Sequence, residues 1–130
     1  MEPTYQEFYR GEIYYADMNT VFSHGEADLL PVLVLLTDQG LYGSPTVMVA
    51  EAGHTTQKPL QPTHVLLEDT GFLLGGVVFQ LEKSRPLDKR RLRERAGRLT
   101  AGQMERIDTA LRSYFYLEDG DYLPLEIEAP

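Results

Sequence analysis

Residues 29–36 read LLPVLVLL, and this stretch decides the fold. Eight apolar residues in a row are about the length of a strand and show no alternation with polar residues. Such a run is typical of a strand that is buried on both faces. Pro31 lies near its start, where the missing backbone donor is tolerated. We therefore expect a central strand here, covered from both sides.

Shorter strand-like segments lie around this run. Residues 12–17 (EIYYAD) precede it, and residues 46–50, 64–67 and 77–81 follow it, separated by clusters of Gly, Pro, Asp and Thr. Short strands with turn signals between them are typical of a sandwich or a barrel. No helical periodicity marks a crossover connection, so we expect one mainly β domain with an antiparallel or mixed sheet.

The C-terminal part is helical in pattern. Thr100 and Gln103 fit a capping box, which satisfies free backbone donors at the start of a helix. Over residues 101–116 the apolar residues recur at helical spacing, and they are Met104, Ile107, Ala110, Leu111 and Tyr114. We expect the aromatic end at 114–116 to belong to the core. The domain then spans residues 1–117, followed by an acidic tail at 118–130.

Charge is unevenly distributed along the chain. The net charge is −8, yet eight of the twelve basic residues lie between Lys83 and Arg98, and residues 118–130 carry five acids and no base. One basic face could therefore bind nucleic acid in spite of the total. The simpler alternative is that the basic side chains only solvate a surface element; they are Lys89, Arg90, Arg91, Arg93 and Arg95.

Several classes of protein are excluded by composition. The chain has no cysteine, which rules out disulfides, zinc fingers and thiol catalysis. No apolar run reaches the ~20 residues of a membrane-spanning helix, and the acidic, aromatic start MEPTYQEFYRGE is unlike a secretory signal. We expect a cytoplasmic protein without a membrane partner.

Six segments, in order and at matching spacing, resemble the MazF/PemK family of bacterial toxins. RGEIYYAD at 10–17 resembles the family's opening RGDVYFADL-type strand, and PVLV at 31–34 resembles its RPVLV strand. Residues 38–46, PTHV at 62–65, LEKSR at 81–85 (family LEQIR) and residues 87–92 before the capped helix continue the match. The resemblance runs from about residue 10 to residue 117.

This resemblance implies a fold and an activity. The fold would be an SH3-like barrel of the MazF/PemK/CcdB type, with mostly antiparallel strands. Family members are homodimers that cut single-stranded RNA, often messenger RNA, at short sequences and without a cofactor. A small antitoxin partner restrains them, usually by laying an acidic or apolar segment across the RNA groove.

The resemblance also locates the family's catalytic positions, and here this sequence departs from the pattern. An arginine stands immediately before PVLV in the family, where this chain has Leu30; a threonine or serine ends the following strand, where it has Gly53. The glutamine of LEQ is Lys83, and a glycine pair is replaced by Ala27 and Asp28. Leucine has no donor for a phosphorane, so cleavage is expected to be impaired or lost.

Other residues could take over the chemistry. His24 and His54, expected in loops beside the same groove, could act as base and acid near neutral pH, with Thr55 beside them; the alternative is two loop histidines without a role. Candidates for nucleic-acid contact are Glu26, Asp28, Thr56, Lys58, Lys83 and Arg85. His64 is interpreted as structural. A metal site of His24, His54 and Glu26 lacks ligand spacing, so no metal is expected.

Three functions remain open at this stage. The first is a MazF/PemK-like protein with an impaired or absent nuclease that keeps its binding groove. The second is an active, metal-independent endoribonuclease using His24 and His54. The third is a non-catalytic barrel that binds a protein or a nucleic acid, RNA or DNA. The acidic tail could cover a basic groove, or it could be a loosely held end.

Overall fold

The computed structural model describes residues 8–19, 29–36, 44–54, 61–73 and 75–116. In that part of the chain the strands are β1 (Glu12–Asp17), β2 (Leu29–Val34), β3 (Thr46–His54), β4 (His64–Leu67), β5 (Val77–Gln80), β6 (Arg85–Asp88) and β7 (Leu92–Arg98). Two short 3-10 helices, η1 (Leu81–Lys83) and η2 (Lys89–Arg91), flank β6, and the helix α1 spans Ala101–Phe115.

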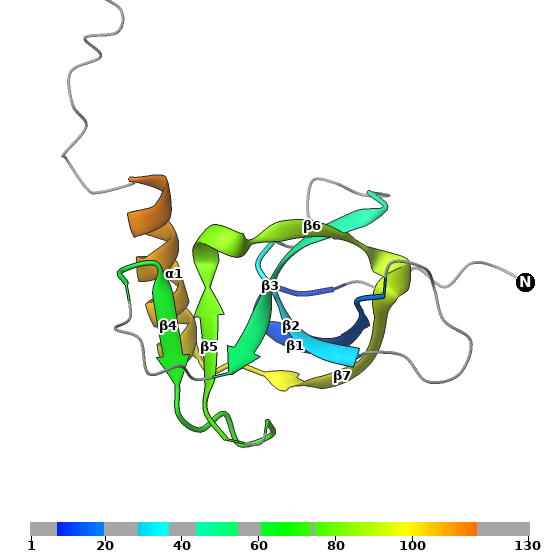
Figure 1. Ribbon diagram of the computed structural model, residues 1–130, viewed down its shortest axis with the longest axis horizontal. Helices are drawn as coiled ribbons and strands as arrows, with labels where there is room; N and C mark the ends of the chain where they lie inside the picture. Colours follow the sequence, from blue (N-terminus) through cyan, green and yellow to red (C-terminus); the bar gives the residue numbers. More distant parts are fainter. Residues whose placement is uncertain (1–7, 20–28, 37–43, 55–60, 74, 117–130) are drawn as a thin grey trace, which may run out of the picture.

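All the strand pairs are antiparallel, in the order β4-β5-β3-β2-β1-β7. The long strand β3 pairs with β6 through its first half and with β5 through its last three residues. Figure 1 shows the result: β6, η2 and β7 curve around β1, β2 and β3 as a barrel, and α1 lies to one side, beside β4 and β5. The mainly β, barrel-like fold with a C-terminal helix is confirmed.

Strand β2 contributes to two separate cores. Val32 and Val34 point into an inner cluster inside the barrel, whereas Leu33 points to the opposite face and joins a cluster under the helix. All three side chains are fully buried. The inner cluster contains Phe8, Tyr14, Ala16, Val32, Val34, Val47, Val49, Leu87 and Leu92. The helix-side cluster includes Ile13, Leu33, Ala50, Phe79, Leu81, Ile107 and Ala110.

The helix begins as the sequence predicts. Thr100 accepts a hydrogen bond from the Gln103 amide at 3.1 Å, and the Gln103 side chain accepts one from the Thr100 amide at 2.8 Å, which completes the capping box. Ile107 and Ala110 are buried against the sheet. A left-handed residue, Tyr116, ends the helix with φ 58°.

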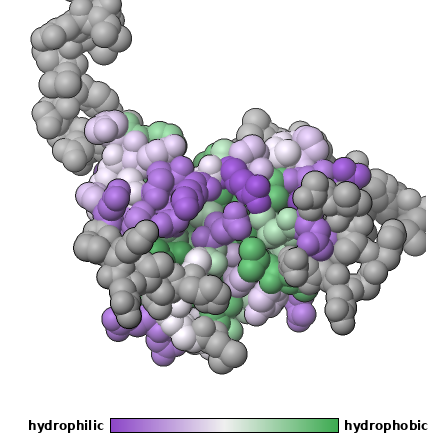
Figure 2. All heavy atoms as spheres, in the orientation of Figure 1, coloured by the Kyte–Doolittle hydropathy of each residue, from purple (hydrophilic) through white to green (hydrophobic). Residues whose placement is uncertain are grey.

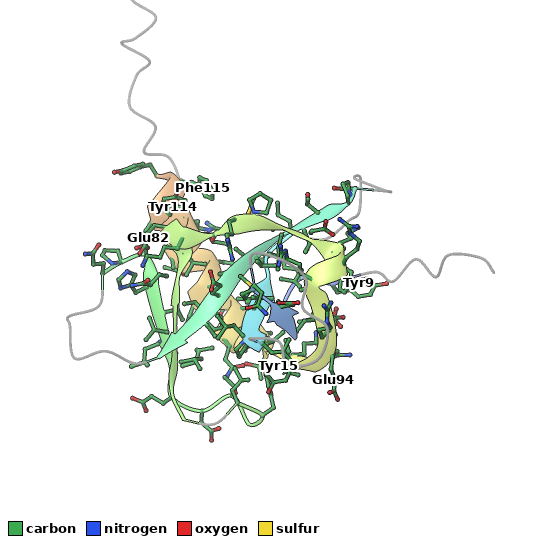
Figure 3. The ribbon with its side chains drawn as sticks, turned by 45° about the vertical axis from the view of Figure 1, so that its right-hand side comes forward. Tyr9, Tyr15, Glu82, Glu94, Tyr114 and Phe115 are labelled. Atoms are coloured by element: carbon green, nitrogen blue, oxygen red, sulfur yellow. The ribbon has the colours of Figure 1, made fainter. Side chains whose placement is uncertain are left out.

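The aromatic end of the helix was predicted as core, and this was wrong. Tyr114, Phe115 and Tyr116 are 39%, 59% and 86% exposed, and Figure 3 shows Tyr114 and Phe115 at the far end of α1. The buried stripe of the helix ends at Ala110 and the half-buried Leu111. The last turn therefore carries the apolar spacing onward without a described surface beneath it.

Other element bounds also differ from the prediction. Strand β2 stops at Val34, and Leu36 is 54% exposed. Strand β3 continues to His54, and Leu81 opens η1 instead of closing β5. Strands β6 and β7 were not predicted, because only Leu87 in β6 and only Leu92 in β7 are fully buried. A strand with one buried residue shows no apolar alternation.

Gly97 generates a prediction about stability. A Cβ built at this position of β7 would lie 2.6 Å from the Phe72 ring, which packs against the helix-side cluster. We expect Gly97→Ala to destabilise the protein by about 1–3 kcal/mol in urea unfolding, since the ring has to move. Gly102→Ala in α1 is the matched control: its Cβ meets nothing within 4 Å, so helix propensity predicts no loss of stability. Equal effects of both substitutions would contradict this packing.

Candidate nucleic-acid interface

One end of the barrel brings together the positions that the resemblance singles out. Leu30 pairs with Ala16 near the end of β1, and Val32 pairs with Glu51 on β3. The β2–β3 pairing ends at Val32 and Glu51, and Leu30 and Gly53 lie beyond it, at the same end of the two antiparallel strands. By strand alternation, Leu30 lies on the same face as Val32, and Gly53 on the same face as Glu51. We call this end the barrel mouth; its residues are Met18, Leu30, Glu51, Gly53 and Arg85.

A guanidinium and a carboxylate lie side by side at the mouth. Arg85 Nη2 is 3.5 Å from Glu51 Oε2 and 3.8 Å from the sulfur of Met18, which packs on the inner cluster. The Arg85 and Glu51 side chains are 49% and 39% exposed. Leu30, also exposed at 39%, adds an apolar surface. Figure 2 shows hydrophobic residues near the middle of the face seen in Figure 1, with hydrophilic residues beside them.

The chemistry available at the mouth follows from these side chains. Arg85 can donate hydrogen bonds to a phosphate, and Glu51 carries the opposite charge. Leu30 has no donor, and Gly53 has no side chain. Among these five residues the Glu51 carboxylate is the group that could accept a proton, and none is a hydroxyl or an imidazole. The described mouth therefore offers one cation, one carboxylate and an apolar side chain.

Most of the other predicted site residues lie outside the described part of the chain; they are His24, Glu26, Ala27, Asp28, Thr55, Thr56 and Lys58. His54 was expected in a loop, but its backbone is the last residue of β3, paired with Val77. Lys83 is exposed on η1, the turn just before Arg85. Of the candidates, Arg85 is the one whose side chain contacts mouth residues, namely Glu51 and Met18.

His64 belongs to a small polar cluster that ties β4 to η1. Its Nε2 is 2.8 Å from Glu82 Oε1, its Nδ1 accepts from the Gln61 amide at 3.3 Å, and the Thr63 hydroxyl donates to Glu82 Oε2. Burial raises the pKa of Glu82, but the hydrogen bonds from Thr63, the Glu82 backbone and His64 together lower it below its usual 4.5. This geometry agrees with a structural role for His64.

Two arginines of the basic run pair with buried carboxylates. Arg93 Nη2 lies 3.4 Å from Asp17 Oδ2, and Asp17 is completely buried. Arg95 Nε lies 3.3 Å from Glu12 Oε2, another buried carboxylate of β1. The run is therefore neither a plain solvated surface nor a set of free cations for nucleic acid, because two of its arginines neutralise buried acids on the neighbouring strand.

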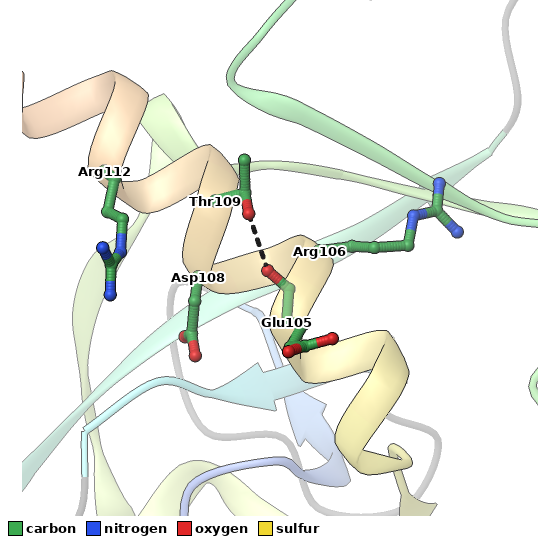
Figure 4. Close-up of a pocket in the computed structure, with 5 residues that line it drawn as sticks. All are labelled: Glu105, Arg106, Asp108, Thr109 and Arg112. Carbon is green, nitrogen blue, oxygen red and sulfur yellow. Dashed lines mark hydrogen bonds between the residues drawn. The ribbon is translucent and has the colours of Figure 1, made fainter. Parts of the chain in front are cut away.

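A second feature of the described surface lies on the helix. A hollow on the outer side of α1 is lined by Glu105, Arg106, Asp108, Thr109 and Arg112 (Figure 4). Two of its charged side chains have partners elsewhere: Asp108 pairs with Arg10, and Arg106 donates to the Leu66 carbonyl at 2.7 Å. Among the described residues, no group of three or more His, Asp or Glu could hold a metal ion. In the same residues no helix is long and apolar enough to span a membrane.

Known structures share this architecture. The chain superposes on "Mycobacterium tuberculosis toxin MazF-mt6" with TM-score 0.65 and 21% identity, covering 82% of this chain and 98% of that one. An endoribonuclease in complex with its cognate antitoxin, from Mycobacterial species, gives TM-score 0.64 and 24% identity over 84% and 95% of the two chains. At these identities the similarity establishes the fold, which is that of the MazF toxins.

Sequence comparison establishes the family. The family of PemK-like, MazF-like toxins of type II toxin-antitoxin systems matches residues 9–115. Endoribonuclease EndoA of Bacillus subtilis (strain 168) is 36% identical over 112 residues, which is 85% of this chain and 96% of EndoA. This chain belongs to the MazF/PemK toxin family.

The Glu82 cluster predicts a pH dependence. A carboxylate whose pKa is lowered on folding adds stability above its unfolded pKa, and this is lost as the pH falls through the folded value. Thr63→Val removes one of the hydrogen bonds that lower the pKa of Glu82. Urea unfolding should therefore show a loss of stability at pH 7 that shrinks at pH 3. Thr109→Val is the control, since its hydroxyl donates to the Glu105 carbonyl; its effect should be the same at both pH values.

Proposed function

We propose that this protein is a MazF/PemK-family protein that binds single-stranded RNA at the barrel mouth and cuts it poorly or not at all. The observation that carries this proposal is the pair of positions Leu30 and Gly53. They lie at the same end of neighbouring strands, where the family resemblance expects an arginine and a threonine or serine. Leu30 is 39% exposed there, so it is not simply a core residue.

The transition state of RNA cleavage would lack a hydrogen-bond donor at Leu30. Cleavage through the ribose hydroxyl develops negative charge on the phosphorane, and a positioned donor stabilises that charge. Removing one such donor costs about 10²–10³ in rate in well-studied hydrolases. A leucine in place of a guanidinium leaves this stabilisation out. Arg85 is a cation nearby, but it is already paired with Glu51.

RNA binding has separate support. Arg85 is exposed at the mouth and Lys83 is exposed two residues before it in the sequence, and an exposed apolar Leu30 can lie against an unstacked base. Single-stranded nucleic acids are bound in this way, by cations along the backbone and by apolar or aromatic contacts to the bases.

The proposal extends to partners and compartment. One similar fold is the Mycobacterial endoribonuclease in complex with its cognate antitoxin. Another is the MazE-MazF structure (Form-II) from Deinococcus radiodurans, with TM-score 0.65 and 18% identity. We propose a small antitoxin partner, a homodimer, and a cytoplasmic location. The exposed rings of Tyr114 and Phe115, with centroids 4.9 Å apart, offer apolar surface for association. The domain would span residues 1–117, with 118–130 as an acidic tail.

A second candidate is an active, metal-independent endoribonuclease. The 36% identity to Endoribonuclease EndoA favours it. In that case His24, His54 and Thr55 would have to supply the proton transfers that Leu30 and Gly53 cannot. The two candidates differ in one measurable property, which is catalytic turnover on RNA in the presence of a chelator.

Restoring the two side chains tests the proposal. The purified wild type should leave long single-stranded RNA intact, or nearly so, in the presence of a chelator. The double variant Leu30→Arg/Gly53→Thr should cut it at least about 10²-fold faster, because it regains a donor for the phosphorane. The measurement is the rate of product formation on a denaturing gel.

The control for this experiment is Leu29→Arg. Leu29 is exposed to a similar degree, 44%, but strand alternation sets it on the opposite face of β2. It adds the same charge without facing the mouth, so cleavage should not rise. Rapid, chelator-resistant cutting by the wild type would reject the proposal in favour of the active enzyme. An unreactive double variant that still folds would favour a barrel unrelated to RNA cleavage.

A further inference from the structure

At the barrel mouth, Glu51 is paired with the arginine that an RNA phosphate would need, Arg85. Arg85 lies opposite Val49 in the β6–β3 register, and Glu51 is two residues further along β3 on the same face. This diagonal arrangement lets a long arginine reach a neighbouring carboxylate, and the observed Nη2–Oε2 distance is 3.5 Å. The guanidinium also lies against the sulfur of Met18, at 3.8 Å. Arg85 is thereby held at the rim of the barrel.

We propose that the Glu51 carboxylate takes the place on Arg85 that an RNA phosphate would take, and so lowers the affinity of the mouth for single-stranded RNA. This inference rests on the proposed function, and it names a residue that regulates the same site. Carboxylate and phosphate oxygens accept the same guanidinium donors. A phosphate approaching Arg85 therefore has to displace Glu51, and it meets a like charge as it does so.

The pair is weak enough to be displaced. Both side chains are substantially exposed, at 49% and 39%, and an exposed ion pair contributes little to stability. Glu51 thus weakens binding without blocking it, and its removal should leave the fold intact. The acidic character of the chain, net −8, adds to this local repulsion.

The test is a binding titration with Glu51→Gln. The probe is a short, fluorescein-labelled 2′-O-methyl oligoribonucleotide of mixed sequence, which the protein cannot cleave through the 2′ oxygen. At low salt we expect Glu51→Gln to bind about three- to tenfold more tightly than the wild type, as expected for removing one like charge within a few ångströms. The slope of log K against log salt should steepen, by about 0.7 at most, since Arg85 neutralises a phosphate more fully once residue 51 is uncharged.

Two further variants make the result specific. Glu94→Gln removes the same charge from an exposed position on β7 (Figure 3). It should raise the affinity only by the small effect of the changed net charge, and it should leave the salt slope unchanged. Glu51→Gln/Arg85→Gln should lose the gain, because no guanidinium is left to release. Circular dichroism and urea unfolding check that all variants fold alike.

The outcomes separate this inference from the proposed function. RNA binding by the wild type, with Glu51→Gln and Glu94→Gln behaving alike, would overturn the role of Glu51 and leave RNA binding standing. A gain that persists in the Glu51→Gln/Arg85→Gln variant would overturn it as well. Folded protein that binds no RNA in any variant, Glu51→Gln included, would overturn both proposals.

Discussion

The fold depends on a strand that cannot tolerate water on either face. Val32 and Val34 in β2 are fully buried on one side and Leu33 on the other. One face is covered because the sheet curls into a barrel, with Leu87 of β6 and Leu92 of β7 closing the inner cluster. The other face is covered by α1 and by the β4–β5 pair. Only the first two residues of β2, Leu29 and Leu30, extend past both cores, and they are exposed for that reason.

An element can be predicted from the sequence when its buried residues form a recognisable apolar pattern within one segment. The apolar strands and the capping box at Thr100 have local signals, so β1, β4 and the start of α1 match their predicted positions. Strands β6 and β7 have none. Their place is decided by partners distant in sequence, such as Asp17, which is paired with Arg93. The prediction for the end of α1 was wrong for the opposite reason. The apolar spacing of the helix continues beyond the described surface that covers it.

The site shows the same division. Leu30 and Gly53 were selected by their positions next to recognisable strands, and the antiparallel pairing of β2 and β3 sets them at the same end of the two strands. The Glu51–Arg85 pair could not be predicted, because it depends on β6 lying beside β3 in one register. The Thr63–His64–Glu82 cluster likewise joins residues 18 and 19 positions apart. His24 and Thr55 lie outside the described residues, so their proposed roles rest on the sequence alone.

The arginines of this protein can be assessed as ligands for nucleic acid only after their ion pairs are known. The run from Lys83 to Arg98 looks like a nucleic-acid surface when it is read by itself. In the fold, Arg93 and Arg95 neutralise buried carboxylates of β1, and Arg85 faces Glu51. Removing an arginine from a buried carboxylate would leave a desolvated charge, so those two side chains are committed to the fold. Arg85 differs because both members of its pair remain in contact with water. It is therefore the arginine of these three that a phosphate can recruit without unfolding the strand that carries it.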